Sequence, residues 1–401
     1  MSIKNSAQND KSIIYIVFLL LLFGLLMIYN ATSYSAQDLF GNAFRFVYLQ
    51  FAWILIGAMA FFAFSNINYK KLEGISYFLF FGNVLLLVLL ALVGLFGCTD
   101  PTDTGISFAP CINGASRWFY FNPAPFPEIP FFEVLSFQPG ELVKLTLIMY
   151  LSVQLGKFTS NSAQSFGRAE KNENKDAFMV YFVTASVVAF LLVLQPNVST
   201  AILVFALATV IYFVSSLPLK PLLTFLPVAM VFVVIAVFTL PHTRSRIITQ
   251  FRGESVENVD AGPGYHIKQI LISLGSGGIF GVGFGQSRQK YQYLPEIATD
   301  SIFAIIGEEL GYIGTTLVIL GFGFLIYKGM MIAKEAPDDL GRMLASGIIS
   351  WIAIQFFVNV AAMTRLIPLT GVPIPLISYG GSSMVFSMIG LGILLNVQKN
   401  S

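Results

Sequence analysis

IIYIVFLLLLFGLLMIY, residues 13–29, is the stretch that decides the fold class of this chain. It carries no charge, and a helix that crosses a bilayer needs about 20 apolar residues. Comparable apolar runs follow at 46–65, 76–97, 178–194, 200–216, 221–240 and 342–363. Further runs, each with a polar residue or a special turn inside or beside it, lie at 138–157, 300–327 and 382–397. The sequence therefore predicts an all-α polytopic membrane protein with about ten transmembrane helices.

The composition supports the same class. Hydrophobic residues make up 56% of the chain and charged residues 11%, against about 25% charged residues in a soluble domain. The net charge of +2, without a basic cluster, gives no indication of nucleic acid as a partner. We expect one transmembrane domain at 13–397, between short tails at 1–12 and 398–401. The first helix should be retained, because no small-residue cleavage site follows it.

The orientation follows from Lys and Arg in the short loops, which are more frequent on the cytoplasmic side. One side holds Lys4, Lys11, Lys70, Lys71, Lys157, Arg168, Lys171, Lys175, Lys220, Lys328, Lys334, Arg342 and Lys399. The opposite short loops hold only Arg45, Arg117 and Arg365. Both termini are therefore expected in the cytoplasm. This leaves extracytoplasmic loops at 98–137 and, between the seventh and eighth helices, at 241–299.

The unusual polar and glycine-rich segments all fall on the predicted outer side. They are INGASRWF (112–119), QPGELVK (138–144), QPNVSTA (195–201), the segment 275–303, and LTGVPIPLISYGGSS (369–383). Irregular backbone beside a membrane is tolerated where it is buried in protein or lines a cavity. A single outward-facing site is the simplest interpretation. Since nucleotides are cytoplasmic, its substrate should bring its own activated bond, as a lipid-linked sugar pyrophosphate does; a transporter cavity would also fit.

Glu141 and Lys144 are three residues apart and share one face of a helix that begins at Pro139. Ionisable side chains in a span usually face a cavity or each other. One interpretation is a structural pair that neutralises itself. The other gives Lys144 a phosphate to bind and Glu141 the task of holding Lys144, and the two are compatible.

Asp300 lies where the long outer segment enters the eighth span. Aspartate is a favoured helix N-cap, so a capping role is one interpretation. The other is a general base that takes the proton from an attacking sugar hydroxyl. Further along this span, we expect a structural or cavity role for one of Glu308 and Glu309. His242 and His266 are isolated, so the sequence predicts no metal site.

The two cysteines, Cys98 and Cys111, both lie in the outer loop at 98–137. Pairing is tolerated outside the reducing cytosol. We expect a disulfide that makes this loop rigid, with two unpaired thiols as the alternative.

Five segments, in this order, resemble the SEDS family of shape, elongation, division and sporulation proteins: NGASRWF, QPGELVK, QPNVSTA, GSGGIFGVGFGQSRQKYQYLPEIATDSIFAIIGEELG and LTGVPIPLISYGGSS. The resemblance covers nearly the whole chain and is closest to the division branch, with the elongation branch second. It implies a ten-helix SEDS-type fold and a peptidoglycan glycosyltransferase that joins lipid II units at the outer face of the bacterial cytoplasmic membrane, releasing undecaprenyl pyrophosphate. The chain departs from the family pattern at Gly140, Asn197, Ser199 and Ala298.

The resemblance also implies roles for particular residues. Asp300 would be the catalytic base. Substrate-binding positions would be Arg117, Glu141, Lys144, Ser378, Tyr379, Gly380 and Gly381. A class B penicillin-binding transpeptidase, other division proteins and membrane lipids are the implied partners. The only cofactor considered is a divalent cation, Mg²⁺ or Mn²⁺, that helps the pyrophosphate leave. The competing functions are a lipid II flippase or transporter and a scaffold that recruits partners.

Overall fold

The computed structural model describes residues 11–98, 105–112, 114–123, 126, 135–162, 168–224, 227, 263–291 and 293–401. Its helices are α2 (Ser12–Phe40), α3 (Arg45–Asn66), the 3₁₀ turn η1 (Tyr69–Lys71), α4 (Leu72–Gly97), α5 (Pro139–Ser162), α6 (Arg168–Leu194), α7 (Val198–Val214), α10 (Pro263–Gly277), α11 (Ile302–Glu335), α12 (Asp339–Met363) and α13 (Gly381–Lys399). Short antiparallel pairs join β1 (Gly105–Ile106) to β2 (Ala109–Pro110) and β3 (Phe119–Tyr120) to β4 (Ser136–Phe137). The all-α fold class is confirmed.

The number of spans agrees only in part with the sequence. Within the described residues, seven helices are long and apolar enough to cross a membrane: α2, α4 (with η1), α3, α6, α11, α12 and α13. Helix α7 is apolar but has 17 residues, and α5 carries the charged Glu141 and Lys144. Most of the predicted run at 221–240 lies outside the described residues. The total of about ten therefore stays a prediction.

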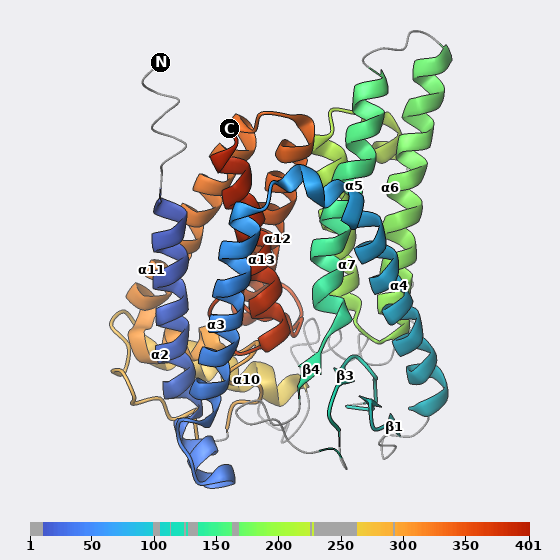
Figure 1. Cartoon of the computed structure of the whole chain (residues 1–401). Helices are drawn as coiled ribbons and strands as arrows, with labels where there is room; N and C mark the ends of the chain where they lie inside the picture. The colour runs from blue at the N-terminus through green and yellow to red at the C-terminus, as the bar shows by residue number, and fades with distance from the viewer. Residues whose placement is uncertain are drawn as a thin grey trace.

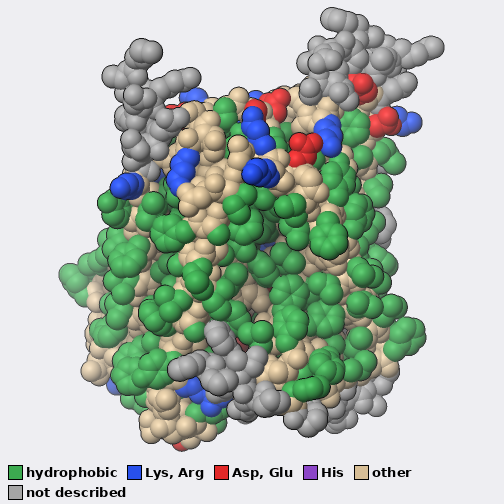
Figure 2. Space-filling view, viewed as in Figure 1, with side chains coloured by type: hydrophobic (Ala, Val, Ile, Leu, Met, Phe, Trp, Pro, Cys, Tyr) green, Lys and Arg blue, Asp and Glu red, His purple; other side chains and the backbone are tan. Residues whose placement is uncertain are grey.

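The long helices run side by side (Figure 1). Helix α2 begins, and α13 ends, at the end opposite to the four short strands and α10. Hydrophobic side chains cover most of the face of the bundle seen in Figure 2, whereas Lys, Arg, Asp and Glu gather on this face near the end where α2 begins. An apolar belt with a charged rim is the surface that a bilayer requires.

Ion pairs and hydrogen bonds join the helices at this charged end. Lys157 of α5 pairs with Glu73 of α4, with an Nζ–Oε1 distance of 3.2 Å. Lys399 of α13 donates to Asn66 of α3, with an Nζ–Oδ1 distance of 2.9 Å. Lys70 pairs with Asp338 at the start of α12, at 3.0 Å. The loops that hold the predicted cytoplasmic lysines therefore meet at one end of the molecule.

Asp338 is the N-cap of α12, and we expect it to contribute to stability in a pH-dependent way. Its Oδ1 accepts from Gly341 N (2.8 Å) and Tyr69 Oη (3.0 Å). Burial raises the pKa of Asp338, but the bonds from Gly341, Lys70 and Tyr69 outweigh it and hold the pKa below its usual value of 3.8. The stabilising contribution is therefore complete above pH 3.8 and is lost as the pH falls further. Asp338→Asn keeps an oxygen for Gly341 N but removes the charge that pairs with Lys70. It should therefore cost up to about 1 kcal/mol and remove this acid-dependent component, as measured by thermal unfolding in detergent across pH.

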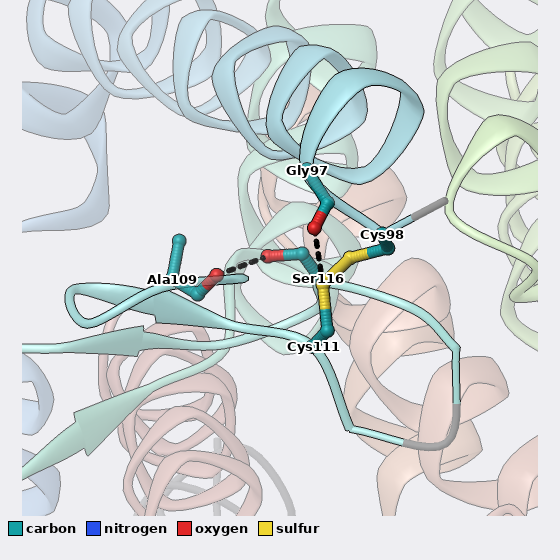
Figure 3. The surroundings of a disulfide bond; sticks show 5 residues. All are labelled: Gly97, Cys98, Ala109, Cys111 and Ser116. Carbon is teal, nitrogen blue, oxygen red and sulfur yellow. Dashed lines mark hydrogen bonds between the residues drawn. A yellow bond between two sulfur atoms is a disulfide. The ribbon is translucent and has the colours of Figure 1, made fainter. Parts of the chain in front are cut away.

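At the opposite end of the bundle, a disulfide ties the segment that follows α4 to the end of this helix (Figure 3). Cys98 and Cys111 are joined, with Cα atoms 5.8 Å apart, and Cys111 Sγ lies 3.2 Å from Gly97 O. Ser116 Oγ donates to Ala109 O at 3.1 Å and closes the hairpin. The structure thus has the predicted disulfide, and the bond holds the segment that leads to Arg117.

Candidate functional site

Asp300 lies at the strand end of the bundle, just before α11. Its side chain is buried, with 8% exposed. The N-cap of α11 is Ser301, whose hydroxyl is bonded to His266 Nε2 at 2.7 Å. The helix therefore begins one residue later than a cap at Asp300 requires. A Cβ placed on Gly371 would lie 3.7 Å from Asp300 Oδ2, so the loop before α13 passes beside the carboxylate.

Two amides on one face of α12 hold the backbone around Asp300. Asn359 Nδ2 donates to Asp300 O (2.7 Å) and to Val372 O (2.8 Å). Gln355, one turn earlier, donates through Nε2 to Pro373 O at 3.0 Å. Both amides are buried. Together they fix the position of Asp300 relative to the loop at 371–380.

The same Gln355 links this loop to the Glu141–Lys144 pair. Lys144 Nζ donates to Glu141 Oε1 (2.7 Å) and to Gln355 Oε1 (2.8 Å), and Trp351 Nε1 also donates to Gln355 Oε1 (2.7 Å). Lys144 is 1% exposed. Glu141 Oε2 is buried without a hydrogen-bond partner. The pair predicted from the sequence exists, and it belongs to one polar network with the backbone of Asp300.

The loop that leads into α13 is fixed from several sides. Gln50 of α3 donates to Ser378 O and accepts from Gly380 N, both at 3.2 Å. Tyr379 N donates to Ala298 O at 2.8 Å. Gln138 N donates to Ser382 Oγ at 3.2 Å. Ser378 uses its own hydroxyl to accept from Ile374 N, so its role in the structure is to close the turn.

Gly381 allows α3 to approach α13. A Cβ at this position would meet the indole of Trp53. Gly380, the residue before it, is the N-cap of α13. The bond from Tyr379 N to Ala298 O ties the predicted substrate-binding positions at 378–381 to the segment that leads to Asp300. Ser378, Gly380 and Gly381 also have structural roles.

Arg117 clamps two outer segments together. Its Nε donates to Gln195 O (3.0 Å) and its Nη2 to Pro196 O (2.8 Å). Gln195 itself donates to Leu87 O in α4 at 2.9 Å, and Asn197 caps α7. The sequence did not suggest this structural role of Arg117. It joins the disulfide loop to the tight turn at 195–197.

Helix α11 is broken at Gly311, where φ is 65° and ψ is −160°. The run predicted at 300–327 lies almost wholly within α11 and contains this break. The break lets the segment 277–288, which we call the glycine loop, pair with the helix backbone: Val282 N donates to Glu308 O and Tyr312 N to Gly278 O, both at 2.9 Å. A Cβ on Gly281 would collide with the carbonyl of Glu309.

Two buried carboxylates hold the far end of the glycine loop. Glu309 accepts from Gly285 N (3.0 Å), from Ser287 N (3.1 Å) and from Asn30 Nδ2 of α2. Glu308 accepts from Ser287 Oγ (2.6 Å), Arg288 N (3.0 Å) and Ser273 Oγ (3.2 Å). Both glutamates therefore have the structural role that was expected for one of them.

Replacement of Asn359 by alanine should impair the site more than it impairs the fold. The change leaves the carbonyls of Asp300 and Val372 without this donor, at a cost of about 1–3 kcal/mol. We expect the activity of the site to fall in Asn359→Ala while the purified protein remains folded, as seen by gel filtration and thermal unfolding. Thr364→Ala is the matched control, because the Thr364 hydroxyl is exposed and bonds to carbonyls of its own helix; equal loss in both variants would contradict the positioning role.

Comparison with known protein families identifies the chain. The FtsW/RodA/SpoVE family, described as cell cycle protein, matches residues 10–401. The chain belongs to this family. This chain is 35% identical to stage V sporulation protein E of Bacillus subtilis, over 98% of this chain and 97% of that relative. The FtsW of Geobacter sp. strain M18, named a probable peptidoglycan glycosyltransferase, is 32% identical over 97% of this chain and 96% of its own.

Solved structures show the same fold. RodA, the rod shape determining protein of Thermus thermophilus, superposes on this FtsW/RodA/SpoVE protein with a TM-score of 0.65 at 24% identity, over 98% of this chain and 97% of RodA. A chain from a peptidoglycan synthase complex that coordinates polymerization and crosslinking superposes with a TM-score of 0.72, also at 24% identity, over 98% of both chains. The predicted family and SEDS-type fold are confirmed.

Proposed function

We propose that this chain polymerises lipid II into glycan strands at the outer face of the bacterial cytoplasmic membrane during cell division, with Asp300 as general base. The enzyme class, peptidoglycan glycosyltransferase, is the one that its FtsW relatives carry. The observation that carries the proposal is the placement of Asp300. Its carboxylate is buried beside the loop at 371–380, and its backbone is held by the network that contains Glu141 and Lys144.

The proposed reaction is a displacement at the anomeric carbon of the donor. Asp300 takes the proton from the acceptor's sugar hydroxyl as its oxygen forms the new glycosidic bond. The bond between the anomeric carbon and the pyrophosphate oxygen breaks, and its electron pair leaves with undecaprenyl pyrophosphate.

The charge on the departing pyrophosphate needs compensation. Lys144 was expected to contact it directly, but its ammonium is buried and bonded to Glu141 and Gln355. We assign Lys144 a positioning role, in which its ammonium group keeps Gln355 in place through their hydrogen bond. It would also place a positive charge in the interior of the bundle, next to Gln355. Two donors of Arg117 are bound to Gln195 and Pro196, so Arg117 would act mainly by shaping the outer rim.

A divalent cation would have to arrive with the pyrophosphate of the substrate. Among the described residues, no group of three His, Cys, Asp or Glu side chains is arranged to hold a metal ion. The transpeptidase partner is supported by the fold shared with a chain from a peptidoglycan synthase complex.

Purified protein, supplied with lipid II and a class B penicillin-binding transpeptidase, tests the proposal. We expect long glycan strands on a gel and release of undecaprenyl pyrophosphate. The flippase alternative predicts that lipid II crosses the bilayer of proteoliposomes without polymerisation. That second result would replace the proposed function.

A further inference from the structure

The glycine loop presents a row of exposed apolar side chains at the edge of the bundle. Phe280 is 79% exposed, and Ile279, Val282 and Phe284 are each at least 42% exposed. They lie within the sequence IFGVGF, residues 279–284. A contiguous apolar patch of this kind marks a surface that is covered by a partner or a membrane.

The backbone of the loop is suited to an environment without water. Val282 N and Gly283 N donate to the carbonyls of Glu308 and Glu309, at 2.9 and 3.1 Å. In return, the carbonyls of Gly278 and Ile279 accept from the amides at 312 and 313 of α11, at 2.9 and 3.2 Å. Irregular backbone at membrane depth requires such internal pairing, because lipid offers no hydrogen bonds.

The loop is continuous with the lipid-facing surface of α11. Residues 310–327 of this helix carry no charge, and Tyr312, Leu317 and Leu320 are exposed along it. The glycine loop pairs with Tyr312 at the outer end of this apolar section. From Tyr312 to Lys328, the first charged residue after the apolar section, the helix rises about 24 Å. Because a hydrocarbon core is about 30 Å thick, Tyr312 and the loop residues paired with it lie near the outer boundary of this core.

The other side of the loop is anchored to the bundle. Tyr291 packs edge-on against Tyr34 of α2, with ring centroids 4.7 Å apart, and Glu309 bonds both to Asn30 of α2 and to Gly285. The loop therefore has one face fixed to α2 and α11 and an apolar face directed away from these contacts.

We propose that the segment 279–284 inserts Ile279, Phe280, Val282 and Phe284 among the acyl chains of the outer leaflet of the cytoplasmic membrane, beside α11. The occupant of this surface is lipid, since the patch extends the apolar surface of a spanning helix at the same level. The inserted loop would fix the height at which the chain runs from residue 289 to Asp300 above the bilayer. The proposal goes beyond the enzymatic activity and does not depend on it.

A fluorescent label placed at Phe280 tests the insertion. Phe280→Cys is labelled with an environment-sensitive maleimide in lipid nanodiscs; Cys98 and Cys111 do not react, because they form the disulfide. Leu320→Cys on α11 is the lipid-facing control. Arg288→Cys is the control for exposure to water. This exposed, charged side chain belongs to the same loop, and its backbone N–H is held by Glu308.

We expect the label at 280 to lose fluorescence with lipids that carry a spin label on the acyl chain, to the same degree as at 320, and to resist aqueous iodide. The label at 288 should show the opposite behaviour. Phe284→Cys gives an independent second position. Quenching by iodide at both 280 and 284, without quenching by the lipids, would overturn the proposal. Protection that appears only after addition of the transpeptidase would overturn it as well, and would assign the patch to a protein partner.

Discussion

Lys144→Met is expected to destabilise the protein by about 3–5 kcal/mol, because it leaves the buried carboxylate of Glu141 without its cation. Lys144 is 1% exposed and donates to both Glu141 and Gln355. Methionine fills a similar volume but donates no hydrogen bond. The loss should appear as a lower melting temperature in detergent, together with loss of glycan synthesis.

The double variant Glu141→Gln/Lys144→Met separates the structural role from the functional one. Removal of both charges should recover most of the lost stability, since neither is then left unpaired. If Lys144 also positions the site through Gln355, glycan synthesis stays low in the recovered protein. Full recovery of both stability and synthesis would show that the pair is only structural.

Glu309→Gln is expected to cost about 2–3 kcal/mol and to release the glycine loop. The carboxylate accepts from Gly285 N, Ser287 N and Asn30 Nδ2, which are all donors. A glutamine amide places its own N–H₂ against at least one of these N–H groups in either orientation. Thermal unfolding and limited proteolysis of the purified protein would detect the released loop.

Glu308→Gln is the matched comparison. Two of the three groups that bond to Glu308 are hydroxyls, of Ser273 and Ser287. A hydroxyl can accept from the new amide as well as donate, so this variant should lose much less stability. If Glu308→Gln were as unstable as Glu309→Gln, this account of the hydrogen bonds between the two glutamates and the glycine loop would be wrong.

Much of the fold follows from the sequence, because apolar runs of membrane length leave few alternatives. The sequence predicts helices at 13–29, 46–65 and 76–97, and each of these ranges lies within a helix of the structure, α2, α3 and α4 respectively. The prediction was less successful where contacts between distant segments decide the structure. The break at Gly311 is such a case: glycine is tolerated in membrane helices, and the break lies where the backbone of 279–281 comes so close to Gly311 that a Cβ would collide with it.

The candidate site was predicted in its parts but not in its connections. Glu141 and Lys144 stood out because charge is rare in spans, and Asp300 stood out by its place at the entry to a span and by the family resemblance. Gln355 and Asn359, which join them, were missed. Their spacing of four residues within the apolar run at 342–363 was a usable signal, since it places two polar side chains on one helix face. The contact of Arg117 with Gln195 and Pro196 joins two distant loops, and no local pattern predicts it.

The central claim is that Asp300 is the base, and glycan synthesis by Asp300→Asn tests it most directly. Wild type, Asp300→Asn and Asp338→Asn are compared with purified lipid II and the transpeptidase partner, after thermal unfolding has shown that each variant is folded. The account predicts that Asp300→Asn loses synthesis by about 10²–10⁴-fold, whereas Asp338→Asn, the same change at the opposite end of the bundle, stays near wild type. Normal synthesis by folded Asp300→Asn would contradict it.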